Sequence, residues 1–175
     1  MIQMNKKTIA YYRKKAEKIF SDAGIVLRDD EKKAVEIADF GLGDFEKEGL
    51  SLITYVNTEN VCAKEMILLP NQTCPEHYHP EKEETFRCRK GSVYLYVAGE
   101  PTGNIKADVP GEYYTVFKEI VLHPGDQYTL TPKTWHWFQG GEKGAIVSEF
   151  STTSTDDEDL FRDPGIVREP ETGDA

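Results

Sequence analysis

The stretch Pro75-Glu-His-Tyr-His-Pro-Glu-Lys-Glu-Glu84 places two histidines, His77 and His79, two positions apart. In a β-strand, side chains two positions apart lie on the same face, so both imidazoles can point into one cavity. A third histidine, His136, lies far along the chain in Trp-His-Trp-Phe, within an expected strand. Together with the carboxylate of Glu84, these residues would supply three neutral nitrogens and one oxygen. Such a set suits a divalent first-row metal such as Mn, Fe, Ni, Co or Zn, with positions left for water or substrate.

The carboxylate of this set has two competitors, Glu81 and Glu83. A two-residue period counted from His79 favours either of them, whereas a turn or bulge after the histidines would reset the register in favour of Glu84. The fourth histidine, His123, precedes a Pro-Gly pair, and we expect it in a turn outside the site.

Short apolar or alternating runs follow Gly49 and predict strands. Turn residues separate the runs, among them Lys90-Gly91 and Gly140-Gly141. Many short strands at regular spacing are typical of an antiparallel sandwich or barrel. The expected strands are 52–56, 61–69, 84–89, 92–97, 112–116, 119–122, 127–130, 135–139 and 145–150.

The N-terminal part has a helical pattern. Between Asn5 and Ala23, apolar residues recur at steps of three and four, which predicts a helix that packs over the sheet. A second short helix is expected over 31–40. We interpret the chain as a single domain, 1–175, with a helical N-terminal segment (1–48), a β-barrel (49–152) and an acidic C-terminal tail (153–175).

Composition excludes several classes of protein. The 175 residues include 21 basic and 31 acidic side chains, a net charge of −10, which argues against nucleic acid as a partner. No apolar stretch is long enough to span a membrane, and the N-terminus lacks a secretory apolar core. The three cysteines are an odd number without metal-knuckle spacing, which predicts no disulfide scaffold. We therefore expect a cytoplasmic protein.

The spacing of the site residues resembles a known superfamily. His77-x-His79, then four residues, Glu84, six residues and Gly91, matches the first motif of the cupins. The second cupin motif is looser, because Pro132 to His136 is one residue short and a glycine replaces the expected asparagine. The resemblance implies a mostly-β cupin fold, a double-stranded β-helix or jelly-roll-like barrel with an N-terminal helical cover, and a homodimer.

A narrower resemblance covers the chain from about Ile67 to Arg168. The runs that carry it are 75–86, Pro-Gly-Asp-Gln-Tyr at 124–128, Trp-His-Trp-Phe at 135–138, Ser-Glu-Phe-Ser-Thr at 148–152 and Phe-Arg-Asp-Pro at 161–164. These runs are similar to cupin-type D-lyxose isomerases. The resemblance implies that His77, His79, Glu84 and His136 hold manganese, with Lys82 and Glu149 beside the sugar. The implied substrate pairs are D-lyxose with D-xylulose and D-mannose with D-fructose.

Aldose–ketose isomerisation moves one proton between C1 and C2 and another between the two oxygens, through an enediolate. It needs a base for the carbon-bound proton and a group that handles the proton on oxygen. Glu149 is the candidate base, although by itself the strand pattern allows an inward or an exposed side chain equally well. Lys82 is the candidate partner for an oxygen, or else a solvated lysine in an acidic run.

Other residues have weaker signals. Gln72 and Thr73 precede the histidines and are candidates to orient them. Two interpretations fit a set of aromatic residues, either as the lining of a sugar pocket or as part of the hydrophobic core: Tyr94, Tyr96, Trp135, Trp137 and Phe138. The acidic tail either closes over the site or is solvated; its candidate residues are Asp156, Asp157, Asp159 and Arg162. Two other functions remain open, a cupin Fe(II) dioxygenase and a non-enzymatic sugar-binding cupin.

Overall fold

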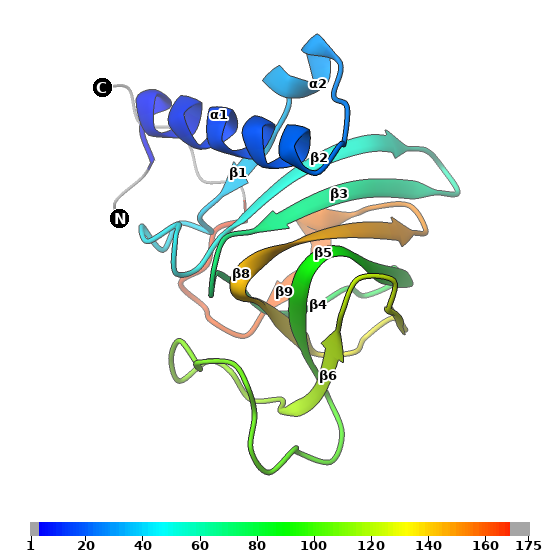
Figure 1. Ribbon diagram of the computed structural model, residues 1–175. Coiled ribbons are helices and arrows are strands. Elements are labelled where there is room, and N and C mark those ends of the chain that lie inside the picture. The colour runs from blue at the N-terminus through cyan, green and yellow to red at the C-terminus, as the bar shows by residue number, and fades with distance from the viewer. Residues whose placement is uncertain (1–3, 169–175) are drawn as a thin grey trace.

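Two long antiparallel strands, β5 (Glu84–Val97) and β8 (His136–Ser151), organise the computed structural model, which describes residues 4–168. They pair with each other along almost their whole length. The second half of β8 pairs with β3 (Cys62–Leu68), and its first half pairs with β4 (Thr73–Tyr78). The strands of residues 4–168 therefore form one continuous sheet that curls on itself, so that its two halves, the first and the second sheet, face each other (Figure 1).

The remaining strands extend these two sheets. β2 (Leu50–Asn57) pairs with β3, and β1 (Glu36–Ala38) pairs with β2. On the other side, β9 (Leu160–Phe161) pairs with β4. The two halves of β5 pair with β7 (Gln127–Leu130) and β6 (Lys118–Leu122). The result is the curled, mostly-β barrel of a cupin, which confirms the expected fold class.

Both long strands bend where the sequence predicts turns. Lys90-Gly91 and Gly140-Gly141 lie inside β5 and β8, so the expected breaks at these pairs are wrong. The ladder shifts register on both sides of Gly91, which has a φ of 72°. A Cβ there would lie 2.0 Å from the carbonyl oxygen of Gly144. Bulges and glycine thus let one continuous strand turn a corner without ending.

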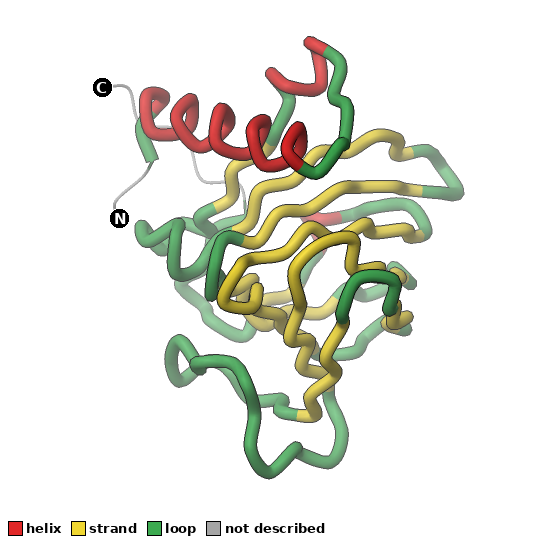
Figure 2. The backbone as a smooth tube through the Cα atoms, viewed as in Figure 1, coloured by secondary structure: helices red, strands yellow, loops and turns green. Residues whose placement is uncertain are grey.

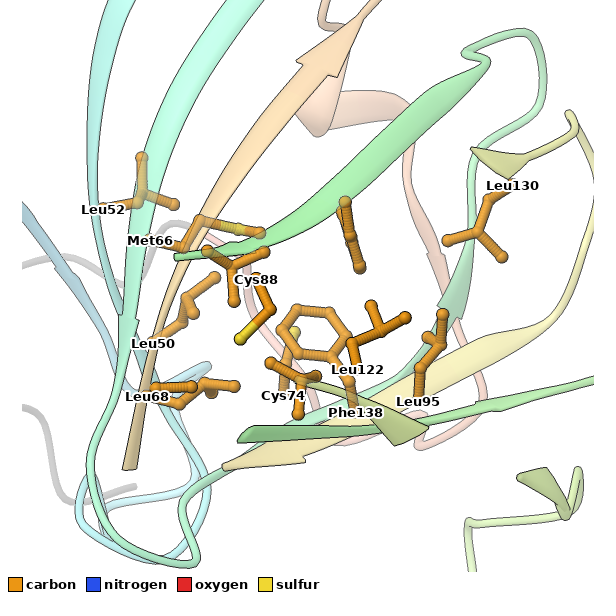
Figure 3. Packing of buried hydrophobic residues seen from close by; sticks show 14 of the residues in the cluster. Leu50, Leu52, Met66, Leu68, Cys74, Cys88, Leu95, Leu122, Leu130 and Phe138 are labelled. Carbon is orange, nitrogen blue, oxygen red and sulfur yellow. The ribbon is translucent and has the colours of Figure 1, made fainter. Parts of the chain in front are cut away.

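The central core fills the space between the two sheets (Figure 3). Helix α1 (Lys6–Asp22), whose first turn is capped by the Asn5 side chain, covers the outer face of the first sheet (Figures 1 and 2). Phe20 packs there against Ile53, Ile67 and Ile146. Tyr96 and Trp137 face away from the central core and pack under the loop 98–117. Each sheet is therefore covered on its outside as well, and the expected helical cover is confirmed.

One expected element differs in its bounds and another is absent. The second helix, α2 (Asp29–Lys33), is shorter than expected, and residues 36–38 instead form β1, because pairing with β2 buries Ala38. Residues 112–116 form no strand. The backbone N–H groups of Thr115 and Val116 donate to the Glu76 carboxylate, so side chains satisfy groups that a ladder would otherwise pair.

None of the expected strand ranges covers β4, which carries His77. A short 3-10 helix, η1 (Asp156–Glu158), precedes β9. The last seven residues of the expected acidic tail lie outside the described residues. Within 4–168, none of the helices has the length and apolar character needed to cross a bilayer.

Candidate active site

Three histidines converge inside the barrel. His77 is the second-last residue of β4 and stands directly opposite His136 of β8 in the ladder, and His79 follows just after the strand. All three side chains are buried, and one ring nitrogen from each lies within 4.8 Å of the others. The expected histidine cluster is therefore present.

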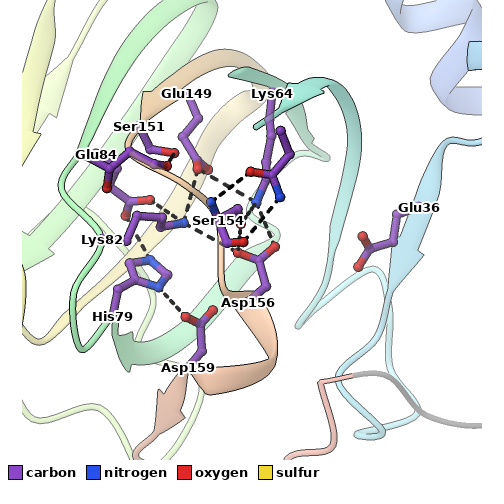
Figure 4. A network of polar contacts seen from close by, with 12 residues as sticks. Glu36, Lys64, His79, Lys82, Glu84, Glu149, Ser151, Ser154, Asp156 and Asp159 are labelled. Atoms are coloured by element: carbon purple, nitrogen blue, oxygen red, sulfur yellow. Dashed lines mark hydrogen bonds and ion pairs between the residues drawn. The ribbon is translucent and has the colours of Figure 1, made fainter. Parts of the chain in front are cut away.

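The other nitrogen of each ring fixes its orientation. Nδ1 of His77 lies 2.7 Å from the carbonyl oxygen of Pro75, and Nδ1 of His136 lies 2.8 Å from that of Thr134. Nδ1 of His79 contacts the carboxylate of Asp159 (Figure 4). Carbonyl and carboxylate oxygens only accept, so each Nδ1 carries the proton and each Nε2 can face the centre of the cluster.

Glu84 is the carboxylate that reaches this centre. Its Oε1 lies 3.1 Å from Nε2 of both His79 and His136. Glu81 and Glu83, the two competitors, are exposed. The strand β5 begins at Glu84, so the register is reset after the histidines.

These residues fit a divalent metal. Nε2 of His136 is buried and makes no hydrogen bond although Glu84 is close. An unsatisfied buried polar atom costs about 1–3 kcal/mol, which coordination of a metal would offset. Three Nε2 atoms and one carboxylate oxygen also match the donors that first-row metals prefer.

Glu149 and Lys82 lie beside this cluster. Glu149 is on the inward face of β8 and only 4% exposed, so the inward orientation holds. Lys82 is 3% exposed, and its Nζ lies 3.2 Å from Oε1 of Glu149 and 2.9 Å from Oε2 of Glu84. Both catalytic candidates therefore line the same cavity as His77, His79 and Glu84.

Lys64 is a site residue that sequence reasoning missed. It pairs with Glu149 across β3 and β8, and its Nζ lies 3.8 Å from Oε1 of Glu149. The one available signal was a lysine on the same strand face as Met66 and Leu68, which are core residues. A charged residue on a buried strand face is unusual unless it is paired.

Burial and neighbouring charges set the protonation of these groups. Burial raises the pKa of Glu149, and the Glu84 carboxylate raises it further, against the two lysines. Burial opposes the ammonium form of Lys82, but Glu84 and Glu149 outweigh it and raise its pKa. Burial likewise lowers the pKa of His79, but Glu84 outweighs this effect and raises it to about 9. Burial and the other two histidines hold the pKa of His77 well below its usual value.

The C-terminal segment reaches the site from a distance in sequence (Figure 4). Asp156 lies 2.7 Å from Nζ of Lys64, and Asp159 contacts His79. Arg162 instead covers the Trp135 ring at 3.7 Å, and Asp157 is exposed. Two of the four expected tail residues thus contribute to the cavity.

Only some of the other residues singled out from the sequence lie at the site. Phe138 lines the cavity, but Tyr96 and Trp137 stack on each other in the separate core under the loop. Gln72 donates to the carbonyl of Phe45, and Thr73 accepts from Gln139. Within residues 4–168, neither side chain hydrogen-bonds to a histidine, so no contact supports the expected orienting role. His123 lies outside the site, as expected.

A model of the D-lyxose isomerase family matches residues 9–172. The chain belongs to this family. It is 56% identical to the D-lyxose ketol-isomerase of Cohnella laeviribosi, over 90% of this chain and 92% of the relative. It is 52% identical to the D-lyxose/D-mannose isomerase of Thermosediminibacter oceani, over 98% and 99% of the two chains. The D-lyxose isomerase family thus accounts for nearly the whole sequence.

Solved structures show the same fold at low identity. The L-ribose isomerase of Cellulomonas parahominis superposes on this chain with a TM-score of 0.75 at 16% sequence identity. The match covers 93% of this chain and 94% of the L-ribose isomerase. The enzyme from Acinetobacter sp. DL28 in complex with L-ribose has a TM-score of 0.76 at 14% identity, with 94% of each chain covered. These structures share the fold, and the family match together with the relatives more than 50% identical makes the chain an enzyme that interconverts an aldose and a ketose.

Proposed function

We propose that this enzyme interconverts D-lyxose with D-xylulose, and D-mannose with D-fructose, in a cavity built on His77, His79, Glu84 and His136. The observation that carries the proposal is a buried carboxylate, Glu149, beside the histidine cluster. The names of the relatives from Cohnella and Thermosediminibacter support the choice of sugars.

Three Nε2 atoms and the Glu84 carboxylate would hold the metal, for which we propose Mn(II). Fe, Co, Ni and Zn use the same donors, so ligand type alone does not select among them. When bound, the metal supplies positive charge that stabilises the oxygens of the sugar as they become negative.

Glu149 is the proposed base. Its carboxylate would take the proton from C2 of the aldose and return it to C1, and the ketose results when the hydroxyl proton of O2 has also passed to O1. A pKa raised by burial and by Glu84 brings this group nearer to neutral pH, where a carboxyl can both accept and donate a proton efficiently.

Lys82 is the proposed hydrogen-bond donor to a sugar oxygen. Its raised pKa keeps the ammonium group charged, so it cannot act as a base at neutral pH. It also holds Oε1 of Glu149 at 3.2 Å, which fixes the base relative to the histidines. The two residues therefore have separate roles: Glu149 moves the carbon-bound proton, and Lys82 stabilises charge on oxygen.

A homodimer in the cytoplasm is the proposed state of the enzyme, with a small-molecule sugar as its partner. The homodimer rests on the resemblance to cupins, and light scattering of the purified protein tests it. The alternatives of an Fe(II) dioxygenase or a sugar-binding protein without activity do not account for a buried base held by an ammonium group.

The deciding experiment compares Glu149→Gln with Glu65→Gln. Glu65 is also buried, but it lies on the outer face of the neighbouring strand, where Ser148 donates to it. Ketose formation is measured from D-lyxose, D-mannose and D-xylose with Mn(II) present. Glu149→Gln should lose kcat by roughly 100-fold or more, and Glu65→Gln should stay within about threefold of the wild type.

Two results would contradict the proposal. An active Glu149→Gln variant would remove Glu149 as the base. If the wild type forms no ketose from any of the three sugars, the substrate assignment fails, and oxygen uptake with Fe(II) then tests the dioxygenase alternative.

A further inference from the structure

The three histidines are oriented by different kinds of acceptor. His77 and His136 each use the backbone carbonyl two residues earlier, which no substitution removes. His79 instead uses the side-chain carboxylate of Asp159, which lies 80 positions later in the sequence. Of these three rings, His79 is therefore the one whose orientation depends on another side chain.

The position of Asp159 follows from strand pairing. β9 pairs with β4 so that Tyr78 stands opposite Leu160 and His77 opposite Phe161. The next pair of positions in this register is His79 and Asp159. Directly opposed residues of antiparallel strands project to the same side and lie close together. The pairing of β9 thus delivers the carboxylate to Nδ1 of His79.

The segment that carries Asp159 is anchored independently of it. Ser154 and Asn57 exchange two hydrogen bonds before η1, and the N–H of Arg162 donates to the carbonyl of Glu76 after it. The N–H of Val167 also donates to the carbonyl of Phe40. Loss of the Asp159 carboxylate should therefore leave the path of the chain in place.

We propose that Asp159 is a positioning residue for the metal, acting through His79, and that the C-terminal segment is thereby a working part of the metal site. This inference rests on the proposed metal role of His79. The carboxylate holds the proton on Nδ1, fixes the ring plane and makes Nε2 a stronger donor. Loss of such a partner typically weakens metal binding 10–100-fold.

The test compares Asp159→Asn with Asp157→Asn. Asp157 lies on the same segment, is exposed, and therefore controls for loss of one acidic charge. The metal-stripped full-length proteins are titrated with Mn(II), and free Mn(II) is followed by electron paramagnetic resonance. Asp159→Asn should bind Mn(II) about 10–100-fold more weakly than the wild type, and Asp157→Asn should stay within about twofold.

A second measurement separates positioning from a structural role. In protein labelled with ¹⁵N-histidine and loaded with Zn(II), the Nδ1–H proton of His79 should shift in Asp159→Asn. The corresponding signals of His77 and His136 should remain, because their backbone acceptors are unchanged. A structural role would instead shift all three signals together.

Three outcomes of the titration would overturn the inference. In the first, Asp159→Asn binds Mn(II) as tightly as the wild type. In the second, both variants weaken binding equally, which would assign the effect to overall charge. In the third, the wild type binds no Mn(II) at all, which would overturn the proposed metal site together with this inference. Weak binding in Asp159→Asn but not in Asp157→Asn, with the signals of His77 and His136 unchanged, supports it; a shift of all three signals overturns it.

Discussion

Charges alternate in sign through the barrel, from Glu84 to Lys82, Glu149, Lys64 and Asp156. Each lies within ion-pair distance of the next. Burial makes the partners depend on one another, because removal of one leaves an uncompensated charge in a low-dielectric interior. The chain of charges therefore stabilises the site and also sets the protonation of its catalytic groups.

The Asp156 carboxylate should make the free energy of unfolding depend on pH in the acid range. Burial opposes its ionisation, but Lys64 and Lys82 outweigh burial and hold the pKa of Asp156 well below its usual value. Because the folded pKa is the lower one, the stabilisation is complete above the unfolded pKa of about 4 and is lost as the pH falls below it. Near neutral pH, we expect Asp156→Asn to lose roughly 2 kcal/mol of unfolding free energy.

Urea unfolding of both proteins from neutral to acid pH measures this difference. It should shrink as the pH falls from about 4 towards the lower folded pKa, since the carboxyl of the unfolded chain is protonated first and that of folded Asp156 last. A difference that is the same at every pH would show that the charge of Asp156 is not the cause.

His136 should be needed for metal binding, whereas His123 should not. His136 contributes a buried Nε2 to the cluster, and His123 is an exposed turn residue. His136→Ala should weaken Mn(II) binding by roughly 100-fold or more, and His123→Ala should leave it unchanged. Metal content after dialysis checks both variants; full metal content in His136→Ala would remove this residue from the ligand set.

At the scale of elements, the sequence predicts what is periodic and misses what the tertiary structure decides. The α1 pattern and the His77-x-His79 spacing are local, so helix and histidine cluster were both predictable. From the sequence alone, Gly91 looks like a turn residue. Only the pairing of the strands shows that it bends a continuous strand. Asp159 could not be separated from Asp157, since the pairing of β9 brings one of them to the site and leaves the other in solvent.

The bend at Gly91 should tolerate no side chain. Its positive φ is strained for an alanine, and the new Cβ would lie 2.0 Å from a backbone oxygen. Gly91→Ala should lose about 2 kcal/mol or more of unfolding free energy, measured by urea denaturation. Gly103→Ala is the matched control, because its Cβ would meet nothing within 4 Å. Equal stability of the two variants would show that the bend does not need glycine.

At the scale of the whole molecule, the site lies where both sheets and the C-terminal segment meet. Its residues come from β3, β4, β5, β8 and the segment around η1, including the connection that holds His79 and Lys82. A ligand that binds there contacts elements from most of the described chain. Binding should therefore stabilise the fold as a unit.

Mn(II) should raise the melting temperature of the metal-stripped enzyme. At a free concentration near 100 times Kd, the linkage contributes about 2.7 kcal/mol. For a chain of this length, that corresponds to a rise of roughly 5–10 °C. Differential scanning calorimetry measures the shift, with His136→Ala as a control that should show little of it. If Mn(II) leaves the melting temperature of the wild type unchanged, this would argue against a metal in the barrel.

The most direct test of the whole account is ketose formation from D-lyxose by the wild-type enzyme, first stripped of metal and then reloaded with Mn(II). We expect almost no D-xylulose from the stripped protein and restored turnover after reloading. Full turnover without any metal would contradict the role given to the histidine cluster, and no turnover in the reloaded enzyme would contradict the proposed reaction.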